Sequence, residues 1–348
     1  MTQSKFNSKP AFSEGVKGGA QCRSEVYKDI HGASSSAPTE QSPLKAGFGG
    51  KKHGTVAIIG APNAGKSTLT NAILGQKLSI VSPKVQTTRN AIKAIIIEGQ
   101  TQLIIIDTPG IFIPRNDKIL ERIIVKSAWQ GLRNTDHTCF LIDATVGLNQ
   151  ENLRIIGDLK KENLQPTLII NKIDLVKKTT ILEIMAGLVA LGFEDIFPIS
   201  AETKDGVEKI KKFLCEKCQN PGWIYDEDQI TDAPMRFIAS EITREKLFLK
   251  LSQELPYSLT VKTDAYEVLD NREIKIHQTI FVLKDSQKSI ILGKNGAMIK
   301  QIGLEARNDI SEIAGNKTHL FLFVKVKKDW MQHSESYEML DSDRLPKH

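Results

Sequence analysis

Short apolar runs alternate with amphipathic stretches from Thr55 to about Gln219. Runs rich in Ile, Val and Leu predict buried strands at 55–59, 92–98, 102–106, 138–142, 167–170 and 195–199. Apolar residues at helical spacing predict helices at 66–75, 116–133, 149–161, 179–191 and 205–218. This alternation is typical of an α/β sheet with helices on its faces. The hairpin signal Glu98-Gly-Gln-Thr predicts one antiparallel strand in an otherwise parallel sheet.

The pattern changes after residue 220, so the first domain is predicted to occupy 54–220. Proline, glycine and acidic residues predict a linker at 221–234, which Trp223 and Tyr225 are suited to fix against one domain. An amphipathic helix is then predicted over Met235–Leu255. It is followed by alternating strands at 259–263 and 274–283, helical stretches on both sides of 293–296 as far as Ile313, and a strand at 319–326. A second, α+β domain is therefore predicted over 235–332.

The two ends of the chain lack this periodicity. Residues 1–53 are rich in Ser, Gly, Lys and Ala and are predicted to be a disordered extension, and 333–348 reads as a polar tail. The extension has no apolar segment typical of a signal peptide, and its acidic residues and single arginine, Arg23, disfavour a transit peptide. An extended or misassigned start explains it as well.

Composition narrows the class only a little. No apolar run approaches the ~18 residues of a membrane span, and the net charge of +6 favours polyanionic partners without identifying one. Four cysteines in 348 residues do not suggest a disulfide scaffold. Cys215 and Cys218 have a metal-site spacing, but no second pair accompanies them and their segment is helical in pattern, so we interpret them as ordinary helix residues.

The strongest chemical signal is a glycine-rich turn between the first strand and the first helix. Gly60-Ala61-Pro62-Asn63-Ala64-Gly65-Lys66-Ser67-Thr68 places backbone N–H groups and a helix N-terminus together, which makes an anion cradle. Lys66 can reach the β- and γ-phosphates of a nucleotide, and the Ser67 hydroxyl can bind Mg²⁺. An ordinary glycine-rich turn is the plainer interpretation, which the flanking strand and helix disfavour.

Three later segments at strand ends point to a guanine nucleotide. Asp107-Thr108-Pro109-Gly110 can hold the Mg²⁺ shell through Asp107 and meet a γ-phosphate with the Gly110 N–H. Within Asn171-Lys172-Ile173-Asp174, Asp174 can accept two parallel hydrogen bonds from guanine. Asn171 can brace the loop, and the Lys172 stem can lie over the base. In Ser200-Ala201 the Ala201 N–H can donate to guanine O6. Surface turns and a helix cap would explain each segment singly, but not their shared position at strand ends.

The second domain carries a Gly293-Lys294-Asn295-Gly296 turn between two helical stretches. Such a turn lets the backbone approach four nucleotides of a single strand, as in a KH domain. From 288 to 330, eight basic residues stand against four acidic ones, which is the sign that RNA needs. The plainer alternative is a helix–helix corner that uses glycine for geometry alone.

The four nucleotide segments resemble those of the translation-factor-like branch of GTPases. Followed directly by an αββααβ, type II KH domain, they resemble the Era-like family of bacterial ribosome-assembly GTPases, a likeness that covers about 54–332 and includes the linker and Glu241-Ile-Thr-Arg-Glu-Lys-Leu. The resemblance implies a Ras-like sheet with one antiparallel strand. It also implies Mg²⁺ held by Ser67, Asp107 and a threonine from Gln86-Thr87-Thr88-Arg89, for which we favour Thr88 over Thr87.

The resemblance further implies slow GTP hydrolysis, with Lys66, Thr88, Gly110 and Asn63 as the catalytic set. Ile111 stands where Ras-like enzymes have a water-orienting glutamine, and Asn63 matches an asparagine with which some relatives recruit K⁺. The alternative to a K⁺-binding role is that Asn63 only braces the loop. The implied partners are the 3′ end of small-subunit (16S) ribosomal RNA and the maturing 30S particle. A cytoplasmic monomer is implied, with some relatives found at the inner membrane.

Three other functions stay open at this point. One is a GTPase of a neighbouring branch that acts in tRNA modification or large-subunit assembly, which the KH-like half disfavours. Another is an RNA-binding module with a degenerate nucleotide domain, which the intact motifs disfavour. The third is an ATPase, which Asp174 disfavours because adenine lacks the two donors that this carboxylate would pair with.

Overall fold

The computed structural model describes residues 50–330 except 83, 85, 86, 115–118, 133, 134, 253, 254 and 329. Nearly all of the predicted N-terminal extension and the whole predicted polar tail lie outside the described residues. Gly50–His53, which the prediction placed in the extension, are described, and Lys52 and His53 already belong to the first strand.

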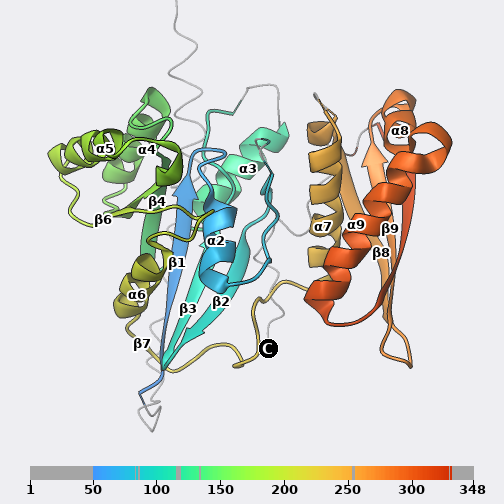
Figure 1. The fold of residues 1–348 in the computed structure, drawn as a ribbon, viewed down its shortest axis with the longest axis horizontal. Coiled ribbons are helices and arrows are strands. Elements are labelled where there is room, and N and C mark those ends of the chain that lie inside the picture. Colours follow the sequence, from blue (N-terminus) through green and yellow to red (C-terminus); the bar gives the residue numbers. More distant parts are fainter. Residues whose placement is uncertain are drawn as a thin grey trace, which may run out of the picture. The chain divides into compact units, whose positions relative to one another are not determined.

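The first sheet has the strand order β2-β3-β1-β4-β5-β6 (Figure 1). Its strands are β1 (Lys52–Gly60), β2 (Ile92–Glu98), β3 (Thr101–Asp107), β4 (His137–Asp143), β5 (Thr167–Asn171) and β6 (Ile196–Pro198). Neighbours are parallel except β2, which runs antiparallel to β3, so the hairpin prediction is confirmed. The two-residue strand β7 (Asn220–Pro221) also pairs with β1, antiparallel, and was not predicted.

Alternate residues of β1 belong to two different cores. Val56 and Ile58 pack with the helices of one face, and Ala57 and Ile59 pack with those of the other. The first face carries α2 (Lys66–Leu74) and α6 (Val207–Lys217), and the second carries α3 (Ile119–Gln130), α4 (Gln150–Lys161) and α5 (Lys178–Ala190). A strand buried on both sides explains why its sequence reads as a continuous apolar run.

The segment after β7 is held against the first sheet by its aromatic residues. The Trp223 indole N–H donates to the Gln100 carbonyl at 3.0 Å, and the Gln102 amide donates to the Tyr225 carbonyl at 2.8 Å. Lys51 lies over the Trp223 ring, 3.7 Å from its centroid. The prediction that Trp223 and Tyr225 fix the linker to one domain is therefore confirmed.

The second sheet has the order β10-β9-β8, with β9 antiparallel to β8 and parallel to β10. Its elements are α7 (Met235–Lys250), β8 (Leu259–Val268), β9 (Ile274–Val282), α8 (Asp285–Leu292), α9 (Ala297–Ala314) and β10 (Thr318–Val326). The predicted αββααβ order is confirmed. The prediction that the first of these helices reaches Leu255 is wrong. Leu251 is extended, and the Phe248 and Leu251 carbonyls accept hydrogen bonds from Lys84 instead.

Candidate nucleotide and nucleic-acid sites

The turn between β1 and α2 has no room for side chains at its two glycines. Gly60 has φ +157°, and a Cβ there would lie 2.5 Å from the Leu141 carbonyl oxygen. Gly65 has φ +98°, and a Cβ there would lie 2.3 Å from the Asn171 side-chain nitrogen. The loop is thus packed against β4 and the end of β5, which fixes the direction of its N–H groups.

Lys66 is the first residue of α2 and is almost completely buried, with 6 % of its surface exposed. Its ammonium donates to the carbonyls of Gly60 at 3.1 Å and Ala61 at 2.9 Å. Burial lowers the pKa of Lys66 to about 8, although the Asp107 carboxylate opposes that shift. A buried cation with so little negative charge around it is suited to an anionic ligand.

The hydroxyls of Ser67 and Thr88 meet at 2.9 Å, although 21 residues separate them. The Thr87 hydroxyl turns the other way and donates to the Lys84 carbonyl at 2.6 Å. Of the two neighbouring threonines, this geometry favours Thr88 as the partner of Ser67.

Asp107, at the end of β3, is fully buried, and neither of its carboxylate oxygens has a hydrogen bond among the described residues. Burial raises its pKa. The hydroxyls of Ser67 and Ser79 lie close enough to counter that shift, but neither is placed to form a hydrogen bond with the carboxylate. The unpartnered Asp107 carboxylate and the paired hydroxyls of Ser67 and Thr88 are hard oxygen ligands of the kind that fits Mg²⁺.

A cavity of about 340 Å³ lies over this cluster. Its lining comes from the glycine-rich turn, from the segment that carries the threonines and from two strand ends: Pro62, Asn63, Gly65, Lys66, Ser67, Thr68, Ile80, Val81, Ser82, Thr87, Thr88, Gly110 and Lys172. Residues predicted from four separate segments of the chain therefore share one cavity. Asn63, at φ +62°, is exposed beside it.

The turn after β3 is tied to β1 and contributes Gly110 to the cavity lining. Thr108 is fully buried and donates its hydroxyl to the Ile58 carbonyl at 2.7 Å, so its side chain holds the turn to β1. Gly110 packs so closely that a Cβ would lie 3.0 Å from Pro62. The Ile111 N–H donates to the Gly60 carbonyl at 3.0 Å, and the Ile111 side chain is buried in the core. Ile111 thus holds the fold in place and presents nothing to the cavity.

Asn171 joins the two loops that flank the expected base site. Its side-chain nitrogen donates to the Ala64 carbonyl and its oxygen accepts from the Ala201 N–H, both at 2.9 Å. The prediction that Asn171 braces the loop is confirmed. Donation of the Ala201 N–H to guanine O6 stays a prediction; because that N–H is donated to Asn171 here, it would have to be shared with the base or transferred to it.

The other residues of the base segment differ in exposure. The Lys172 ammonium pairs with Asp143 at the end of β4, at 2.6 Å. Asp174 is exposed in a single 3₁₀ turn, Ile173–Leu175, and has no ion pair or hydrogen bond among the described residues. The Ser200 hydroxyl is buried and accepts from the Thr203 N–H at 3.1 Å, so it shapes its own loop.

Sequence reasoning missed the contacts between the threonine-bearing segment and α7. Arg244, with 2 % of its side chain exposed, donates to the Thr87 carbonyl and pairs with Glu241. Glu245 accepts from the Val81 N–H at 2.8 Å and pairs with Lys77. The segment that carries Thr88 therefore cannot move without breaking hydrogen bonds to α7. The signal in the sequence was the group of charged residues Glu241, Arg244 and Glu245 within an amphipathic helix, since buried charges need partners.

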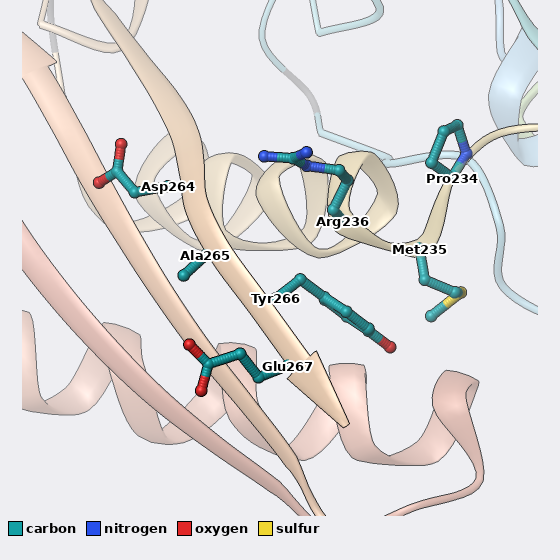
Figure 2. A pocket seen from close by; sticks show the side chains of 7 residues that line it. All are labelled: Pro234, Met235, Arg236, Asp264, Ala265, Tyr266 and Glu267. Atoms are coloured by element: carbon teal, nitrogen blue, oxygen red, sulfur yellow. The ribbon is translucent and has the colours of Figure 1, made fainter. Parts of the chain in front are cut away.

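A second cavity, of about 460 Å³, lies where α7 begins beside β8. Figure 2 shows Arg236, Met235 and Tyr266 between the helix and β8, while the carboxylates of Asp264 and Glu267 point to the other side of the strand. Arg236 donates to the Thr263 carbonyl at 3.0 Å. None of its lining residues belongs to a predicted motif, so this larger space is not the nucleotide site.

The turn Gly293–Gly296 is well formed for backbone contact. Gly293 has φ +70°, and a Cβ there would lie 2.7 Å from the Met298 side chain. Gly296 has φ +75°, but nothing lies within 4 Å of where its Cβ would be. Lys294 and Asn295 are exposed, and α9 begins directly after the turn. Open space, a lysine and a helix N-terminus therefore meet at one point.

Two family models match the chain. The model described as a 50S ribosome-binding GTPase matches residues 55–172, and the KH domain model matches residues 254–331. The two matches follow the division into two sheets.

Curated relatives and solved structures cover most of the chain. "GTPase Era" of Bradyrhizobium sp. (strain ORS 278) is 48% identical over 84% of this chain and 95% of its own length, and "GTPase Era" of Rickettsia conorii is 42% identical over 95% and 97%. A crystal structure of Era with MgGDPNP and nucleotides 1506–1542 of 16S ribosomal RNA has a TM-score of 0.79 at 35% identity, over 84% of this chain and 99% of its own. A single-residue variant of Aquifex aeolicus Era bound to GDP.AlF4⁻ scores 0.79 at 35% identity, over 83% and 99%.

Proposed function

The chain belongs to the Era family of GTPases, and from that premise we propose that it binds GTP over α2 and binds the 3′ end of 16S ribosomal RNA at the Gly293–Gly296 turn. In this function it assists maturation of the 30S subunit. The observation that supports the nucleotide half best is the unpartnered buried carboxylate of Asp107 beside the Ser67–Thr88 pair. The RNA half is supported by the exposed turn and by the RNA-bound relative.

Hydrolysis depends on how the loop residues hold the triphosphate. Lys66 exchanges its carbonyl partners for β- and γ-phosphate oxygens, and the loop N–H groups bind the remaining oxygens. Ser67, Thr88 and Asp107 hold Mg²⁺, which neutralises charge on the phosphates when it is bound. Gly110, at the cavity edge, offers its N–H to the γ-phosphate. The charge that develops in the transition state thus meets donors that are already in place.

No side chain at position 111 can orient the attacking water, because Ile111 is buried in the core. We therefore expect slow intrinsic turnover. Asn63 is the exposed polar side chain at the cavity that could bind K⁺, and K⁺ activation stays a prediction. Replacing K⁺ with Na⁺ should slow the parent chain but leave Asn63→Ala unchanged. Equal rates of the parent in both salts would contradict it.

Two measurements test the proposal as a whole. Titration with fluorescent GDP, competed by GTP and by ATP, should show displacement by GTP alone at comparable concentrations. Sequencing of RNA crosslinked to the chain in cells should place the reads at the 3′ end of 16S ribosomal RNA. Equal competition by ATP would overturn the guanine assignment, and reads in transfer RNA or large-subunit RNA would instead support the neighbouring-branch alternative.

Location and oligomeric state stay predictions from the family. Among the described residues, no helix is both long and apolar enough to cross a bilayer. A cytoplasmic monomer with peripheral contact to the inner membrane is proposed on the family likeness alone. Sedimentation of the purified chain and flotation with anionic vesicles would test the two parts separately.

A further inference from the structure

Among the described residues, the helices that pack on the second sheet all lie on one of its faces. Alternate residues of β9 and β10, such as Ile276, Ile280 and Val324, pack in the cores with α7, α8 and α9. The residues between them point to the opposite side, which we call the open face. At its centre lie His277, Phe321 and Phe323.

The three rings of the open face form an ordered group. The His277 and Phe321 centroids are 4.8 Å apart at an interplanar angle of 16°, and those of His277 and Phe323 are 6.1 Å apart at 8°. Phe321 is 45% exposed and Phe323 is 50% exposed. Two neighbouring phenylalanines with half their surface in water form an exposed apolar patch, and patches of this kind can mark binding surfaces.

The near-parallel rings offer exposed faces on which nucleobases can stack. Phe321 and Phe323 are two residues apart on one strand, a repeat of roughly 6.6 Å, and His277 stacks with both of them. Bases would therefore stack on the outer, exposed faces of the group and not between its rings. Aromatic rings that stand on a strand are a common platform for single-stranded nucleic acid.

Charge on the open face supports the same ligand. Lys325 and Lys327 continue the alternation of β10 beyond the phenylalanines, and Lys325 is exposed without an ion-pair partner among the described residues. Lys327 lies 5.9 Å from the Phe281 ring centroid. Two of the nearby acids are paired with cations, Glu273 with Lys317 and His319, and Glu267 with Lys275. Asp264 accepts from the Thr279 hydroxyl at 2.6 Å and keeps its charge.

The open face also adjoins the glycine turn. Among the described residues β10 is an edge strand of its sheet, and it packs against α8 and α9, the helices that flank Gly293–Gly296. One strand therefore carries the two phenylalanines and contacts both helices of the turn. We infer that the open face is a second contact for single-stranded RNA, on which nucleotides that extend beyond those held at the turn stack against His277, Phe321 and Phe323. This inference rests on the proposed function of the turn.

The test compares two oligonucleotides from the small-subunit 3′ end. The short oligonucleotide has about four nucleotides, the number that a KH turn clamps. The long oligonucleotide contains the same nucleotides and about six more on each side. Phe321→Ala with Phe323→Ala should weaken the long oligonucleotide about tenfold, or about 1.4 kcal/mol, and leave the short one unchanged. Phe323→Trp should keep parent affinity, and Leu249→Ala, which removes a side chain of 49% exposure from α7, is the matched control.

Two further readouts identify the contact. A 2-aminopurine in the extension should be quenched on binding to the parent and not on binding to the double alanine variant. Lys325→Ala should lower the log–log salt slope for the long oligonucleotide by about 0.7. Parent-like affinity of the double alanine variant for the long oligonucleotide would overturn the inference. A dimer of the parent chain that this variant dissociates would also overturn it, in favour of a second copy.

The turn itself is tested separately by Lys294→Asp with Asn295→Asp on the short oligonucleotide. If this variant binds the short RNA normally, the proposed function of the turn fails, whatever the phenylalanine variants show. If it loses the short RNA while the phenylalanine variants keep the long one, the turn stands and the open face does not.

Discussion

Two glycine turns, each leading into a helix and each with a lysine at or next to it, differ in their surroundings in this molecule. In the turn before α2, both glycines pack closely against other elements, and a cavity lies over the loop. Lys66, the first residue of α2, is buried. In the turn before α9, Lys294 is exposed and the second glycine faces open space. The local motif supplies N–H groups and a positive helix end in both. The surroundings decide whether one compact triphosphate is enclosed or a long chain of phosphodiesters is held at the surface.

The largest expected effect comes from replacing one glycine in each turn with alanine. Gly65→Ala would put a methyl group 2.3 Å from the Asn171 nitrogen at φ +98°, so we expect loss of measurable GTP binding. Gly296→Ala meets nothing within 4 Å and should cost only the strain of its φ, about 1–2 kcal/mol of stability. Fluorescent GDP titration and urea unfolding of both variants measure this difference. Parent-like nucleotide affinity in Gly65→Ala would show that the loop relaxes.

A change confined to the second turn should leave the first intact. Lys294→Asp with Asn295→Asp puts two negative charges where phosphates approach, so binding of single-stranded RNA should fall below detection while GTP affinity stays within about twofold. Lys294→Ala is the milder partner and should only flatten the salt dependence, by a slope of about 0.7. Filter binding across a salt series measures both. A parallel loss of GTP binding in the double variant would mean that the turns do not act independently.

Base choice sharpens the comparison because Asp174, the carboxylate that we propose reads the base, belongs to the segment that Asn171 joins to the first turn. Asp174→Asn replaces an acceptor with a group that also donates, so GTP affinity should fall about 10- to 100-fold. Xanthine nucleotides should bind better than they do to the parent, since their exocyclic oxygen accepts from an amide. Competition with XTP and GTP measures the exchange. The exposed Glu202→Gln in the next loop serves as a control for loss of one surface charge.

The last expected effect is a pH dependence that belongs to the buried lysine and needs no substitution to be seen. Folding without nucleotide favours the neutral form of Lys66, whose pKa is lowered to about 8 by burial, from 10.5. The unfolded chain therefore binds more protons between these values, and stability should rise with pH from about 8 to 10.5. Nucleotide favours the charged form, so GTP affinity should fall above a pH of about 8, by at most about tenfold per unit. Lys66→Met should remove the rise in stability, which urea unfolding on either side of this pH range can show.

Much of the site could be predicted because its chemistry is local. The strand, turn and helix around Lys66, the hairpin of β2 and β3, and the αββααβ order follow from short-range periodicity and turn residues. The placing of Asp107, Asn171 and Asp174 at strand ends also follows, because parallel strands bring their carboxyl ends to one edge. Helix ends were less certain. α7 stops at Lys250, short of the predicted Leu255, because its last carbonyls are satisfied by Lys84 of a distant segment.

From the order of residues alone, the type of each element and the chemical class of each turn could be predicted. Tertiary contacts place the Thr88 hydroxyl, and not that of Thr87, beside Ser67, join the Ala201 N–H to Asn171, and bury Ile111 in the core. It also linked Arg244 to the segment that carries Thr88 and gathered three rings on the open face. These outcomes depend on contacts between residues far apart in the chain. Periodicity reports which side of its own element a residue faces, and the partner across the gap is set by packing.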